Sequence, residues 1–269
     1  MNLSSVTIGQ YFPGNSYLHR LDPRTKILAV IFLSVAIFLP QTWAGHALTV
    51  AFSLVAVALA QVPLKFIIRG LRPILIFMLF AMIFNAFLTP GEKLFAIGTL
   101  TVTREGLILS GVAAIRLVMV VIVASLLTLT TSPILLTDGI ERLLRPLSPI
   151  GVPAHELALM MTIALRFIPT LMEEADRIMR AQTARGADFQ TGNIVNRVKG
   201  LIPVMVPLFV AAFRRADELA TAMEARGYRG GKGRTKMKEL ALGGHDLVAA
   251  VVVVLFTGVV VFMRVTGRG

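Results

Sequence analysis

The feature that most restricts the fold of this chain is a series of apolar runs that are almost free of charged residues. Residues 107–130 contain one charged side chain, Arg116, and residues 247–263 contain none. About 20 apolar residues in a helix cross the hydrocarbon core of a bilayer, and about 17 can suffice. The chain is 55% hydrophobic and 16% charged, with a mean hydropathy of +0.76, which lies outside the usual balance of a soluble domain. The sequence therefore predicts a membrane protein.

The apolar runs predict the number and order of the membrane helices. The first run is short for a span, but its start is well specified because Asp22 is a good helix N-cap and Pro23 suits the first helical position. From Ser132 onward, charged residues and prolines interrupt the apolar sequence. We expect an all-α polytopic membrane protein with about five transmembrane helices and a cytoplasmic helical region before the last of them. The expected spans are residues 27–40, 46–62, 73–88, 107–130 and 247–263, and the expected domains are residues 1–131, 132–244 and 245–269.

Basic residues set the expected orientation of the chain in the membrane. Lysine and arginine number 27 against 15 acidic residues, a net charge of +12, and cytoplasmic loops of membrane proteins are rich in basic residues. Lys65, Arg69 and Arg72 follow the second run and place that loop in the cytoplasm, whereas the loop at residues 90–106 has little net charge and suits the outer face. The polar N-terminal segment lacks the order of a cleavable signal peptide. We therefore expect the N-terminus in the cytoplasm and the C-terminus outside.

Several kinds of chemistry lack the residues that they require. The chain has no cysteine, which excludes disulfides and thiol chemistry, and its four histidines fall in different segments without the i, i+4 spacing of a helical metal site. No phosphate-binding loop is present, and the nearest glycine-rich stretch, residues 230–235, lacks the required spacing. The basic stretch 226–238 contains one aromatic residue, Tyr228, and no nucleic-acid-binding module. We predict no catalytic residue, no metal, no cofactor and no nucleic-acid partner.

Two long segments combine an apolar half with a charged half. Residues 154–186 and residues 193–227 both begin apolar and end charged, and the hydrophobic residues of the charged halves recur at helical spacing. Pro169 interrupts the first segment, where a kink is expected, and Pro203 and Pro207 lie in the apolar half of the second. Because neither segment is a clean span of about 20 apolar residues, we expect long helices that lie against or beneath the membrane.

Both segments end on the same tripeptide, Ala-Arg-Gly. Their arginines, Arg185 and Arg226, stand 41 positions apart (226 minus 185), and each follows an Ala-Asp pair at the same distance. A single copy is explained as a helix end, since arginine suits the negative end of the helix dipole and glycine closes the helix in the left-handed conformation. Two copies favour a role in binding a partner. Each copy presents a guanidinium at the end of a long helix, and a carboxylate is the group that binds a guanidinium best. The residues of this candidate partner-binding site are Ala184, Arg185, Gly186, Ala225, Arg226 and Gly227.

Three stretches of the chain carry a resemblance to a known family. Residues 11–27, YFPGNSYLHRLDPRTKI, look like the N-terminal signature of that family, and the paired Ala-Arg-Gly matches its most specific motif. Residues 223–235, MEARGYRGGKGRT, are close to its vitamin-transporting branch. On these residues the chain resembles the transmembrane T component of energy-coupling factor transporters, the family that includes the cobalt-transport Q proteins. The resemblance covers nearly the whole chain.

The resemblance implies a function and a set of partners. It implies a non-catalytic scaffold in a prokaryotic cell membrane, which joins two ABC-type ATPase subunits to one small membrane-embedded substrate-binding S component for vitamin uptake. It also implies that the cytoplasmic helices form a coupling region, in which Arg185 and Arg226 each enter a groove on one ATPase and pair with acidic side chains. Two alternatives are the same role in a dedicated cobalt or nickel importer, and a membrane anchor that binds a cytoplasmic partner without transport.

The resemblance also points to a surface for the S component on the apolar halves of the two long helices. Methionine repacks readily, so a surface rich in methionine and leucine suits the exchange of partners. For any one of these residues taken alone, contact with lipid or with the protein core is the simpler interpretation. The expected contact residues are Leu157, Met160, Met161, Met205 and Leu208.

Overall fold

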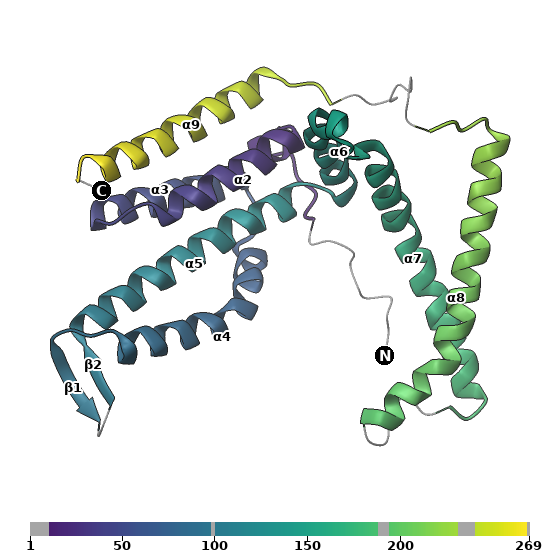
Figure 1. Ribbon diagram of the computed structural model, residues 1–269, viewed down its shortest axis with the longest axis horizontal. Helices are drawn as coiled ribbons and strands as arrows, with labels where there is room; N and C mark the ends of the chain where they lie inside the picture. Colours follow the sequence, from purple (N-terminus) through teal and green to yellow (C-terminus); the bar gives the residue numbers. More distant parts are fainter. Residues whose placement is uncertain (1–10, 98–99, 188–193, 231–239, 268–269) are drawn as a thin grey trace. The chain divides into compact units, whose positions relative to one another are not determined.

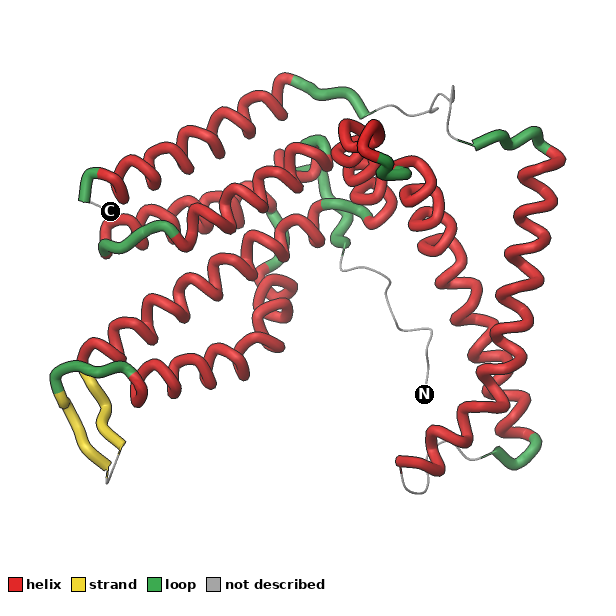
Figure 2. Tube along the Cα trace, in the orientation of Figure 1, coloured by secondary structure: helices red, strands yellow, loops and turns green. Residues whose placement is uncertain are grey.

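The computed structural model describes residues 11–97, 100–187, 194–230 and 240–267, and these are almost entirely helical (Figures 1 and 2). An antiparallel pair of short strands is the exception within this part of the chain. The all-α prediction is confirmed. The helices are α1 (Tyr17–Arg20), α2 (Pro23–Phe38), α3 (Trp43–Ala60), α4 (Leu64–Leu88), α5 (Arg104–Thr130), α6 (Pro133–Leu144), the 3-10 helix Arg145–Ile150, α7 (Ala154–Ala184), α8 (Ile194–Ala225) and α9 (Gly244–Val265), and the strands are β1 (Lys93–Ile97) and β2 (Leu100–Thr103).

Among the described residues, five helices are long and apolar enough to cross a membrane: α3, α4, α5, α7 and α9. The number matches the prediction, but one member of the set differs. α2, expected as the first span, has 16 residues, and a helix of that length rises only about 24 Å against a hydrocarbon core of about 30 Å. α7, expected against or beneath the membrane, has 31 residues because the helix continues through Pro169, and it meets the length and composition of a span.

Contacts divide the chain into two compact units. The bundle unit holds the described residues of 10–139 and 240–269, and the crossed-helix unit holds those of 140–239. The core of the bundle unit comes from α2, α3, α5 and α9 with Ile67 of α4, and Phe52 of α3 stacks on Phe256 of α9 with ring centroids 4.1 Å apart. The domain limits expected from the sequence, at residues 131 and 244, stay a prediction. The buried face of α5, at helical spacing, consists of Met119, Ile122, Val123, Leu126 and Leu129.

A β-hairpin occupies part of the segment 90–106, for which the sequence predicts a loop. β1 and β2 pair with Lys93 opposite Thr103 and with Ile97 opposite Leu100. The sequence between the strands is Gly98-Thr99, and a glycine-containing pair between two short apolar runs is typical of a hairpin. The signal was therefore available in the sequence. The place of this segment on the outer face of the membrane stays a prediction.

Arg116 lies inside the apolar sequence of α5, where a charged side chain usually faces a polar interior, a partner or the interface. Its Nη2 donates a hydrogen bond to the backbone carbonyl of Pro40, in the link between α2 and α3. Pro40 is fully buried. Because a buried carbonyl outside a helix needs a donor, Arg116 has a structural role in holding this link against α5.

Candidate functional site: the helix tips

Both copies of Ala-Arg-Gly end a long helix in the same way. α7 ends at Ala184 and α8 at Ala225, so the arginine of each copy is the first residue beyond its helix. The next residue has a left-handed backbone, with φ of +89° at Gly186 and +71° at Gly227. Glycine adopts this conformation at little steric cost. The expectation that glycine closes each helix is confirmed.

Paired backbone hydrogen bonds complete each tip. In the first tip, the N–H groups of Gly186 and Ala187 donate at 3.0 Å to the carbonyls three and five residues earlier. In the second tip, the N–H groups of Gly227 and Tyr228 donate at 2.8 and 3.0 Å to the carbonyls at the same two offsets. This is the Schellman motif, which satisfies the free carbonyls at the end of a helix. Two separate helices thus hold their arginines in the same backbone setting.

The side chains of the two tip arginines are exposed. Neither Arg185 nor Arg226 forms an ion pair with another described residue. A guanidinium carries five N–H donors in a planar fork that matches a carboxylate in bidentate geometry. Each tip can therefore bind an acidic side chain of another molecule.

Replacing Gly227 with alanine should destabilise the second tip without a steric clash. No atom lies within 4 Å of the position that the new Cβ would take, so the free energy cost is that of the left-handed backbone, about 1–2 kcal/mol. Gly258→Ala in α9 is the matched control, because its Cβ also meets open space but its backbone is helical, and alanine there should be neutral or stabilise by up to about 1 kcal/mol. Thermal unfolding of the full chain in detergent compares the two variants, and equal effects would contradict a conformational role of Gly227.

α7 and α8 cross each other within the crossed-helix unit, and their C-terminal ends point away from each other (Figure 1). Near the crossing, Glu174 of α7 and Arg215 of α8 approach each other to 3.9 Å, and Arg177 approaches the same carboxylate to 3.8 Å. The Glu174 side chain is 24% exposed, so the contact with Arg215 is partly shielded from solvent. An ion pair in this setting contributes little to the free energy of unfolding. It does place Glu174 of α7 beside Arg215 of α8 and so marks where the two helices contact each other.

The expected contact surface for an S component lies on the apolar halves of α7 and α8. Leu157, Met160 and Met205 are exposed, whereas Met161 and Leu208 are half-buried. Exposed apolar side chains suit contact with lipid as well as with a membrane protein. The assignment of these residues to a partner stays a prediction.

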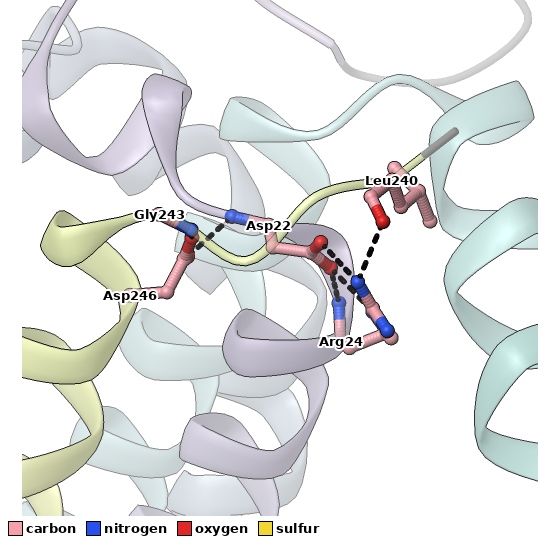
Figure 3. Close-up of polar contacts among 5 residues, drawn as sticks. All are labelled: Asp22, Arg24, Leu240, Gly243 and Asp246. Atoms are coloured by element: carbon pink, nitrogen blue, oxygen red, sulfur yellow. Dashed lines mark hydrogen bonds and ion pairs between the residues drawn. The ribbon is translucent and has the colours of Figure 1, made fainter. Parts of the chain in front are cut away.

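A buried polar network that the sequence analysis missed joins the starts of α2 and α9 in the bundle unit (Figure 3). The carboxylate of Asp246 accepts the backbone N–H of Asp22 at 2.6 Å and the backbone N–H of Gly243 at 2.8 Å. Asp22 and Asp246 are each 6% exposed. Asp246 therefore caps its own helix and at the same time binds the residue that caps α2.

Asp22 has the N-cap role that the sequence predicted, and it also binds a side chain. It accepts the backbone N–H of Arg24 at 2.9 Å, and its two oxygens accept Nε and Nη2 of the same arginine at 3.0 and 2.8 Å. The hydrogen bond to Asp22 raises the pKa of Arg24 above its ordinary value, so the guanidinium stays charged. Arg24 Nη2 also donates to the Leu240 carbonyl at 3.1 Å. The network thus fixes the segment that leads into α9 against the start of α2.

The described residues contain no group of three or more histidine, aspartate or glutamate side chains that could hold a metal ion. Of the glycine-rich stretch that was considered as a phosphate-binding loop, residues 231–235 lie outside the described part of the chain. The role of the two helix tips as a partner-binding site stays a prediction.

Comparison with known proteins gives consistent matches over almost the whole chain. Residues 14–237 match the cobalt transport protein family, CbiQ. The energy-coupling factor transporter transmembrane protein EcfT of Acidaminococcus fermentans is 53% identical over 262 residues, which cover 97% of this chain and 98% of that protein. The protein of the same name from Clostridium kluyveri is 52% identical over 265 residues, 98% of each chain. That of Bacillus subtilis is 46% identical over 263 residues, 97% of this chain and 99% of the relative.

Proposed function

We propose a function from one premise: this chain belongs to the cobalt transport protein (CbiQ) family and is a transmembrane component of an energy-coupling factor transporter. The chain is the non-catalytic coupling subunit, which passes the motion of two ABC-type ATPase subunits to a small substrate-binding S component for vitamin uptake. It lies in a prokaryotic cell membrane with its N-terminus in the cytoplasm. The observation that carries the proposal is the pair of helix tips with the same backbone geometry and exposed arginines.

The crossed helices explain how motion could pass between the partners. Each ATPase binds one tip, through a bidentate contact between an acidic side chain and Arg185 or Arg226. Because α7 and α8 are single long helices that contact each other at Glu174 and Arg215, a displacement of one tip moves its helix against the other. The apolar halves of the same helices, with Leu157, Met160 and Met205 exposed, carry the motion to the S component.

Transport of cobalt through a dedicated partner is the second candidate function, and the description of the matching family favours it. The two candidates share the tips and the crossed helices, and they differ only in what the S component binds. The names of the relatives specify an energy-coupling factor transporter and no cargo.

Purification of the tagged full chain together with its genomic neighbours, in mild detergent, tests the proposal. Two ATPase chains and one small hydrophobic protein should be recovered with each copy of the chain. Mass spectrometry of the ligand on the small protein then separates a vitamin from a cobalt or nickel ion. Recovery of the chain alone, or with an unrelated acidic partner, would contradict the coupling role and would leave the tips as helix ends or as an anchor site.

A further inference from the structure

A groove lies beside the second helix tip, within the crossed-helix unit. One wall is a face of α7 that runs from Leu159 to Phe167, and the other is a face of α8 that runs from Leu219 to Arg226, both at the i, i+3, i+4, i+7 spacing of a single helix face. The residues from Gly227 to Gly230 also line the groove. The groove encloses about 790 Å³, so it is large enough to receive side chains of another molecule.

Among the described residues that line the groove, three are arginines and none is acidic. Arg166 comes from α7, Arg226 from the tip of α8, and Arg229 from the segment that follows. None of the three forms an ion pair with another residue of the described part of the chain. A second cavity between the same two helices differs in this respect, because two glutamates and two arginines line it: Glu174, Glu218, Arg214 and Arg215. Of these two cavities, the groove at the tip presents three arginines with no acidic side chain among its described lining residues.

The floor of the groove is apolar. Ile163 and Phe167 of α7 and Met223 of α8 line it, and each is half-buried. A surface of this composition binds a segment that offers carboxylates to the arginines and an apolar side chain to the floor. Methionine in such a position adapts to the shape of the bound side chain.

We propose that this groove binds an acidic segment of the ATPase subunit that receives the second tip, and that Arg166 is a partner-binding residue outside the Ala-Arg-Gly motif. The assignment rests on the proposed function, which places an ATPase at that tip. Arg226 and Gly227 belong both to the tip and to the groove, so a subunit that holds the tip also reaches the groove. Its arginines match the negative charge of an acidic segment.

The groove also makes the two tips different. The sequence duplication that relates Arg185 to Arg226 has an offset of 41 residues, and the same offset applied to Arg166 leads to Pro207, which cannot supply a charge. The additional contact is therefore not repeated at the corresponding place on α8. The two tips can distinguish two ATPase subunits through the presence or absence of an acidic segment.

Charge reversal at Arg166 tests the assignment in the complete transporter complex. Arg166→Glu should weaken the binding of the ATPase subunits to the membrane chain by about tenfold at 0.15 M salt, and it should reduce the dependence of that binding on salt. Arg180→Glu is the matched control, because Arg180 is an exposed arginine of the same helix that does not line the groove, and its effect should stay within about twofold. Arg166→Gln removes the charge without reversing it and serves if the glutamate variant does not fold.

The possible results separate the groove from the proposed function. If Arg226→Glu weakens ATPase binding but both Arg166 variants behave like Arg180→Glu, the groove assignment is wrong and the coupling function stands. If Arg226→Glu and Arg185→Glu also leave ATPase binding unchanged, the coupling function itself fails. If Arg166→Glu leaves ATPase binding unchanged but lowers the retention of phosphatidylglycerol in native mass spectrometry, the groove binds an anionic lipid and the proposal is overturned.

Discussion

Reversing the charge of both helix-tip arginines, Arg185→Glu together with Arg226→Glu, should abolish ATP-driven uptake while the chain remains folded. Both side chains are exposed and form no ion pair with other described residues, so their replacement breaks no ion pair within the described part of the chain. In the complex, loss of one side of a buried charged contact costs roughly 2–5 kcal/mol, which corresponds to a factor of about 30 to several thousand in affinity. Uptake of the ligand carried by the co-purified S component, in cells or in proteoliposomes, measures the effect.

Conservative and control variants show whether the loss of uptake comes from the geometry of the guanidinium or from its charge. Arg185→Lys with Arg226→Lys keeps both charges but loses the planar fork, so uptake should fall to an intermediate level. Arg180→Glu changes the charge of α7 by the same amount away from the tip and should leave uptake within about twofold of normal. Normal uptake in the double glutamate variant would exclude the tips as coupling elements. A passive anchor predicts a third pattern, in which charge reversal lowers only the binding of the cytoplasmic partner, whereas a coupling subunit can keep part of its assembly while it loses uptake.

The structural features that the sequence predicted well are set by residues close together in the chain. The end of α8 at Ala225 followed from a glycine two residues later, because a left-handed residue closes a helix through hydrogen bonds within five residues. The five apolar helices followed from hydropathy, which is also a local property. Hydropathy did not predict which five helices these are. Whether α2 or α7 is long enough to cross a membrane depends on where each helix ends, and helix ends are the least certain part of such a prediction.

The parts that the sequence could not predict join residues far apart in the chain. Asp22 and Asp246 are 224 positions apart, and nothing near either residue indicates the other. In the sequence, Asp246 is a single acidic residue directly before the apolar run 247–263, and Asp22 is recognisable only as a helix cap. The groove at the second tip also joins residues far apart in the chain. Arg166 lies in the middle of α7, and it lines the same groove as Arg226 because α7 and α8 cross.

Replacing Asp22 with alanine should produce the largest loss of stability among single substitutions in the polar network of Figure 3. The change removes the cap of α2, worth about 1 kcal/mol, and leaves the partly buried Arg24 guanidinium without its carboxylate. Because the Arg24 side chain is 21% exposed, loss of its hydrogen bonds to the carboxylate costs about 1.5–3 kcal/mol, less than the loss of one partner of a fully buried ion pair. For a chain of this size, each kcal/mol lowers the unfolding temperature by about 2–4 °C, so a decrease of roughly 10 °C is expected.

The matched control for Asp22→Ala is Glu92→Gln, which removes the acidic partner of an exposed pair in the same unit. Glu92 and Arg104 are 3.8 Å apart with side chains 76% and 66% exposed, so this loss should stay below about 0.5 kcal/mol. The fluorescence of Trp43, the one tryptophan of the chain, reports on α3 of the bundle unit during heating in detergent. If Asp22→Ala unfolds at the same temperature as Glu92→Gln, the hydrogen bonds around Arg24 do not hold the start of α9 in place. If it unfolds at the expected lower temperature, the contacts around Asp22 and Arg24 hold Leu240 against the start of α2.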